Sequence, residues 1–176
     1  MSVIRPYNFA RYRSLLIENF GVTALDFDGQ YAAWKVQSED SLESEKAFVW
    51  QFLKQWAKVL PEKYPDPYQY FKQLRALYLL LWTYLIVEDK KGTAMLEIAN
   101  HCELKAAELA NFKTYVTIIG GERCAAAEVV NGLAVSLENA LLEQPIPYAN
   151  CSRPLGCICC YGVHWERNLN GKLIPK

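Results

Sequence analysis

The segment Leu77–Val87 (LYLLLWTYLIV) constrains the fold most, because it is apolar on every face of a helix. Asp66 can cap this helix, Pro67 suits its first turn, and Lys90-Lys91-Gly92 supplies a basic last turn followed by glycine. Spanning a bilayer takes about 20 consecutive apolar residues, and this run is shorter and has charged residues on both sides. The sequence therefore predicts a buried central helix over 66–90.

Further segments carry apolar residues at the three-to-four spacing of a helix. They cover residues 8–21, 44–60, 93–112 and 122–143. Asp28-Gly29 is a turn dipeptide between two segments able to pair as strands, which predicts a small β-hairpin near 22–37, with a loop and a short helix as the alternative. The segment 114–119 (TYVTII) has β-branched and aromatic character and predicts a short strand or an extended connector.

These elements predict a mainly α fold of about five helices. The length of 176 residues suits one core. We expect a helical core domain over 1–147 and a Cys-rich C-terminal module over 148–176 docked on it. Asn170-Gly171 predicts that this module contains a β-hairpin after its cysteine loop.

Charge and the N-terminal residues limit the expected partners and location. The formal net charge is zero, which argues against a nucleic-acid partner held through phosphates. The first residues, MSVIRPYN, lack the apolar stretch of a secretory signal, so we expect a cytoplasmic protein whose thiols stay reduced. Disulfide bonds are then not the expected purpose of the six cysteines.

Most of the cysteines gather in the C-terminal tail, where their spacing indicates metal binding. Cys157 and Cys160 form a C-x2-C pair, with Cys151 upstream and His164 downstream. Three thiolates and one imidazole are a ligand set for tetrahedral zinc, and Cys159 is an alternative ligand. The four tail cysteines together could instead hold an iron–sulfur cluster, although the usual spacings for such clusters are absent.

Two other roles for the cysteines stay open. Free cysteine behaves as a small hydrophobe, so the tail could use its thiols for packing alone. In a redox role, Cys157 and Cys160 are the natural pair, because C-x2-C thiols can close a small disulfide ring. Cys124 is a separate candidate for a reactive thiol, since the first turn of a helix and the adjacent Arg123 both favour a thiolate.

A likeness in the last third of the chain suggests a further function. Residues 128–133 (EVVNGL), followed by Cys151 and Cys159 with a glycine between them, resemble the C-terminal stretch of the small-molecule-binding domains named after vinyl reductases. The resemblance implies a pocket for a small ligand, and the seven Phe, eleven Tyr and five Trp residues could line one for an apolar molecule.

The sequence thus favours a non-enzymatic binding or regulatory protein whose tail binds metal or senses redox state. The first alternative is a thiol-dependent enzyme or redox protein that uses Cys124 or the tail cysteines. The second is a domain that binds a small apolar ligand. The partner is accordingly a protein or a small apolar molecule.

Overall fold

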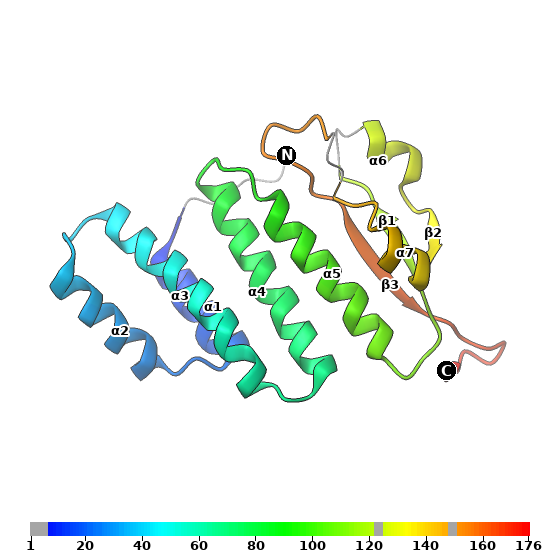
Figure 1. The fold of residues 1–176 in the computed structure, drawn as a ribbon, viewed down its shortest axis with the longest axis horizontal. Coiled ribbons are helices and arrows are strands. Elements are labelled where there is room, and N and C mark those ends of the chain that lie inside the picture. Colours follow the sequence, from blue (N-terminus) through cyan, green and yellow to red (C-terminus); the bar gives the residue numbers. More distant parts are fainter. Residues whose placement is uncertain (1–6, 122–124, 148–150) are drawn as a thin grey trace. The chain divides into compact units, whose positions relative to one another are not determined.

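The computed structural model describes residues 7–121, 125–147 and 151–176. This part of the chain is mainly helical, with seven helices and a small three-stranded antiparallel sheet toward the C-terminus, which confirms the predicted fold class (Figure 1). The chain divides into two compact units, Met1–Val59 and Leu60–Lys176. The predicted boundary at 147/148 falls inside the second unit. None of the helices in the described ranges is long and apolar enough to cross a membrane.

The first unit contains α1 (Phe9–Phe20), α2 (Ala24–Gln37) and most of α3 (Leu42–Lys63). The side chain of Asn8 accepts a hydrogen bond from the backbone N–H of Arg11 at 2.9 Å and so caps α1. Gly21 ends the helix in the left-handed conformation, at φ 61°. Both ends of this helix lie where the sequence predicted them.

The hairpin predicted near 22–37 is wrong, because this segment forms α2. Thr23 caps the helix by accepting a hydrogen bond from the backbone N–H of Asp26 at 3.0 Å. The carboxylate of Asp28, which the prediction placed in a turn, binds the guanidinium of Arg13 at 2.6 and 2.7 Å instead. Helical periodicity outweighs the Asp-Gly signal, because a helix buries Phe27 and directs the aromatic residues that follow it toward the same side.

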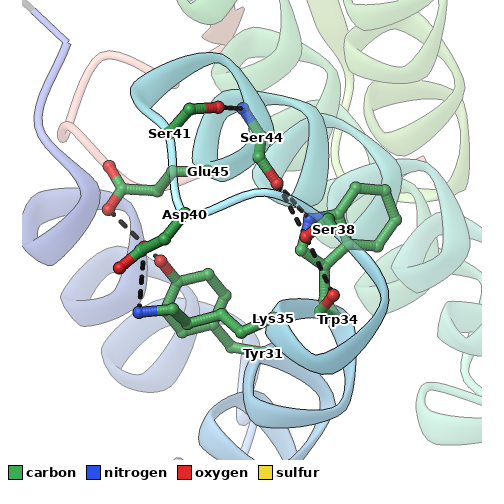
Figure 2. A network of polar contacts seen from close by, with 8 residues as sticks. All are labelled: Tyr31, Trp34, Lys35, Ser38, Asp40, Ser41, Ser44 and Glu45. Carbon is green, nitrogen blue, oxygen red and sulfur yellow. Dashed lines mark hydrogen bonds and ion pairs between the residues drawn. The ribbon is translucent and has the colours of Figure 1, made fainter.

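Aromatic rings fill the core of the first unit. The ring of Phe27 is fully buried, and its centre lies 4.9 Å from that of Phe52 and 5.3 Å from that of Phe48. Polar contacts fix the turn between α2 and α3 (Figure 2). There, Trp34 Nε1 donates to Ser44 Oγ at 2.9 Å, and Ser44 Oγ donates to Ser38 Oγ at 2.8 Å. The position of α2 on α3 is therefore set by packing and by hydrogen bonds.

The second unit is built on α4 (Pro67–Val87) and α5 (Thr93–Leu109), which pack side by side (Figure 1). Asp66 caps α4 by accepting a hydrogen bond from the backbone N–H of Gln69 at 2.9 Å. Leu77 and Leu81 of α4 are buried, as expected of the most apolar helix. Both helices confirm the predictions over 66–90 and 93–112.

The sheet has β1 (Thr114–Ile119) at its centre, between β2 (Ala134–Ser136) and β3 (Cys160–Trp165). Both neighbours run antiparallel to β1, and Val116 stands opposite Val135 on one side and Val163 on the other. The strand predicted at 114–119 is confirmed. One core cluster joins the buried residues of β1 and β3 to Leu104 of α5 and Ala140 of α7 (Leu137–Glu143), so α5 and α7 cover the same face of the sheet.

The single helix predicted over 122–143 is wrong. The described part of this segment forms α6 (Ala125–Val130), β2 and α7 (Leu137–Glu143). Gly132 adopts φ 80°, a left-handed conformation that glycine accepts without strain, and its N–H donates to the carbonyl oxygen of Ile118 at 2.8 Å. The chain therefore turns back onto β1 and pairs with it. Ser136 then caps α7 by accepting a hydrogen bond from the backbone N–H of Asn139 at 3.1 Å.

The turn predicted at Asn170-Gly171 is present. Gly171 has φ 75°, and Arg167 and Leu173 face each other in an antiparallel bridge. The principal strand of the tail, β3, nevertheless pairs with β1 and not with the residues that follow the turn. The tail is therefore part of the sheet of the second unit.

Candidate functional site

The cysteine segment leads into β3 and contributes to the core beneath the sheet. Cys157, Cys159 and Tyr161 alternate with more exposed residues and are 1%, 0% and 4% exposed. Such alternation is the side-chain period of an extended chain. The three side chains belong to one apolar cluster with Val116 and Leu104, so packing is one established role of these thiols.

Backbone and side-chain groups hold this segment in place. Asn100 of α5 is 4% exposed, and its Nδ2 donates to the carbonyl oxygen of Cys159 at 3.0 Å. The backbone N–H of Gly121 donates to Cys159 Sγ at 3.3 Å, and that of Cys159 donates to Cys157 Sγ at 3.4 Å. Gly156 stands at φ 90°, where a Cβ would collide with the side chain of Thr93. The loop is therefore tightly docked on α5.

A charged pair lies near two further thiols. Arg75 Nε of α4 forms an ion pair with Glu103 Oε2 of α5. Burial raises the pKa of Cys102 to about 12, and it also raises the pKa of Cys160; in both cases Arg75 opposes this effect and Glu103 adds to it. Ionised Cys157 would raise the pKa of Cys160 further, so the two thiols of the C-x2-C pair interact. Because thiolates are the nucleophiles, Cys102 and Cys160 are poor ones at neutral pH.

The structure does not bring His164 together with Cys160. The imidazole stacks on the ring of Tyr115 with 5.0 Å between centres, and its Nε2 lies 2.9 Å from Thr117 Oγ1. His164 is four positions further along β3 than Cys160, a separation of about 13 Å in an extended strand. Cys151 lies half-buried against the core cluster.

Among the described residues, no group of three or more His, Cys, Asp or Glu side chains is arranged to hold a metal ion. Cys124, the predicted reactive thiol, lies outside the described residues. Zinc and iron–sulfur binding by the tail therefore stay predictions.

A cleft that sequence reasoning missed lies between α5 and α7, beside β1 and β2. Its volume is about 740 Å³. Three leucines of α7 supply its apolar lining, and the rest of the lining is polar or charged. The lining residues are His101, Lys105, Glu108, Thr114, Ser136, Leu137, Glu138, Leu141, Leu142 and Lys176. These positions are spread over the last 76 residues of the chain, so no local motif could have indicated the cleft.

The polar groups around the cleft mostly bind one another. Lys105 Nζ forms an ion pair with a carboxylate oxygen of Glu108 at 2.9 Å. Lys176 Nζ donates to the backbone carbonyl oxygen of Glu108, which attaches the end of the chain to α5. His101 Nδ1 lies 3.0 Å from Nε2 of Gln144, the residue after α7. These contacts leave the rim polar while fixing its side chains in place.

No protein-family model, curated protein or solved structure matches this chain. The class of protein is therefore defined by the fold and the site alone. The second unit is a helical pair beside a three-stranded antiparallel sheet, with a densely packed cysteine segment and an open cleft between α5 and α7.

Proposed function

We propose that this chain is a non-enzymatic binding protein, and that its ligand is a small molecule with an apolar body that occupies the cleft between α5 and α7. The observation that carries the proposal is the size and lining of the cleft. Its volume of about 740 Å³ lies within the range of roughly 300–1,000 Å³ typical of small-molecule sites. Leu137, Leu141 and Leu142 offer apolar contact, and polar groups at the rim offer orientation.

Polar groups at the rim are held in structural contacts. Lys105 and Glu108 form an ion pair, and the hydroxyl of Ser136 caps α7. These groups hold the walls of the cleft and can contact the polar end of a ligand.

The proposal is tested by titrating the protein with Nile red, an uncharged apolar dye, and measuring its fluorescence. Leu142 lines the cleft and is 77% exposed, so Leu142→Glu leaves the core intact. Val129 of α6 is 87% exposed and is not among the lining residues, so Val129→Glu is a matched control. Native mass spectrometry of the freshly purified protein then looks for a ligand retained from the cell.

We expect one saturable dye site per chain. The affinity for the dye should fall about tenfold in Leu142→Glu, because the dye loses about 1.5 kcal/mol of apolar contact with the leucine. The control should bind the dye as the parent protein does. Absence of saturable binding, or equal loss in both variants, would contradict the proposal.

A second candidate function is metal binding or redox sensing by the tail. It is supported by the backbone N–H groups directed at Cys157 Sγ and Cys159 Sγ, because the sulfurs of metal sites commonly accept such hydrogen bonds. In this structure the side chains that would bind one ion lie apart. Metal binding by three or four tail residues therefore requires them to come together.

A further inference from the structure

The side of α2 opposite its buried aromatic face carries an exposed apolar stripe. Leu25, Gly29, Ala32 and Val36 recur at steps of four, three and four, which places them on one side of a helix. Leu25 is 82% exposed and Val36 is 86% exposed, and a Cβ added to Gly29 would meet nothing within 4 Å. Phe27, on the other side, is fully buried. One apolar face of α2 is thus buried in the core of the first unit, and the other is exposed to solvent.

The order of residues along the stripe is self-complementary. Read in either direction, it is large, small, small, large. When two copies of α2 lie antiparallel about a two-fold axis, Leu25 meets Val36 of the second copy, and Gly29 meets Ala32. The small central residues let the helix backbones approach closely, and the large residues pack at the two ends. We propose that the stripe is a docking surface for a second copy of this chain, paired antiparallel through α2.

The charges beside the stripe support this orientation. Asp28 and Lys35 lie along the same edge of the stripe, seven residues apart. In an antiparallel pair, residues along this edge face the same edge of the other helix, so Asp28 of one copy lies beside Lys35 of the other. Within its own chain Asp28 binds Arg13, and Lys35 binds Asp40 (Figure 2). The cross-chain pair therefore sets orientation more than affinity.

The size of the stripe sets the expected strength of association. From Leu25 to Val36 the helix rises about 17 Å. A single helix pair of this length buries less than the roughly 1,200–2,000 Å² of a stable protein interface, so we expect a reversible dimer with Kd on the order of 10–100 μM. The aromatic core and the polar contacts at the α2–α3 turn hold α2 in place, so little ordering is needed on association.

The test is sedimentation equilibrium of the pure full-length protein over a range of concentrations. Leu25→Glu and Val36→Lys each place a charge in the stripe and should leave the protein monomeric at about 1 mM, well above the expected Kd. In the double variant, Glu at position 25 of one copy lies beside Lys at position 36 of the other, so it should dimerise more tightly than either single variant but more weakly than the parent, because exposed ion pairs replace apolar contact. Within one chain these positions are too far apart to pair, about 17 Å.

Val129→Lys, equally exposed but outside the stripe, serves as the control and should dimerise as the parent does. Circular dichroism checks that each variant is folded. A parent protein that stays monomeric up to about 1 mM, or charged single variants that still dimerise, would overturn the proposal. A double variant that dimerises no more tightly than the single variants would overturn the antiparallel register.

Discussion

Replacing Asn100 should loosen the cysteine segment and destabilise the second unit. Asn100 is 4% exposed, and its side chain provides the donor for the carbonyl oxygen of Cys159. In Asn100→Ala that buried carbonyl loses its partner, at a cost of about 1–3 kcal/mol, and the vacated volume adds to the loss. We expect the free energy of unfolding to fall by about 2–3 kcal/mol.

The assay uses the location of the thiols. All six cysteines lie within Leu60–Lys176, so their labelling by a thiol reagent in increasing urea reports unfolding of this unit. Peptide mass spectrometry resolves Cys159, whose labelling in native buffer should rise in Asn100→Ala because the loop opens more often. Asn139→Ala, at an exposed position, is the control and should change the free energy of unfolding by less than about 0.5 kcal/mol. Equal stabilities and equal Cys159 labelling in both variants would refute the reasoning.

Asn100→Asp separates the lost donor from the lost volume, because it keeps the shape of the side chain. A buried carboxylate facing the carbonyl of Cys159 is disfavoured, so the pKa of the new acid is raised in the folded state. A raised pKa means that the folded state holds the proton more tightly than the unfolded chain. The variant should therefore be closest to the parent below the ordinary aspartate pKa of about 3.9 and should lose stability as the pH rises from there.

Two further predictions concern the thiols. Burial raises the pKa of Cys102 from 9.0 to about 12, so the folded protein keeps this thiol protonated at pH values where the unfolded chain ionises it. The free energy of unfolding should therefore fall as the pH rises from 9 toward 12. Urea titrations should show a smaller fall over this pH range in Cys102→Ala. The second candidate function predicts about one zinc ion per chain in protein purified without chelators, measured by elemental analysis. This zinc should be lost in Cys157→Ser and in Cys160→Ser and retained in Cys102→Ser. A metal-free parent protein that is fully folded would contradict metal binding by the tail.

Elements specified by local chemistry could be predicted from the sequence, whereas those that depend on distant pairing could not. Asn8 and Asp66 cap helices at the predicted positions, because an N-cap acts within three residues. The hairpin predicted from Asp28-Gly29 is wrong for the opposite reason, because distant contacts decide the structure there. Asp28 pairs with Arg13, 15 residues away, and α2 buries Phe27. Gly132 was likewise predicted to lie within a helix, but its N–H donates to the carbonyl oxygen of Ile118 in β1.

The candidate sites show the same limit. Close spacing in sequence predicts convergent ligands only where the chain curls, and β3 extends between Cys160 and His164, which separates thiol from imidazole. The cleft shows the opposite case, in which residues far apart in the sequence line one site. Lys105 and Leu142 both line it only because Gly132 turns the chain and β2 pairs with β1. The sequence could therefore suggest a small-ligand domain but not its residues. A substitution that disturbs the Gly132 turn should therefore change the shape of the cleft by shifting β2, although residue 132 is not one of the lining residues.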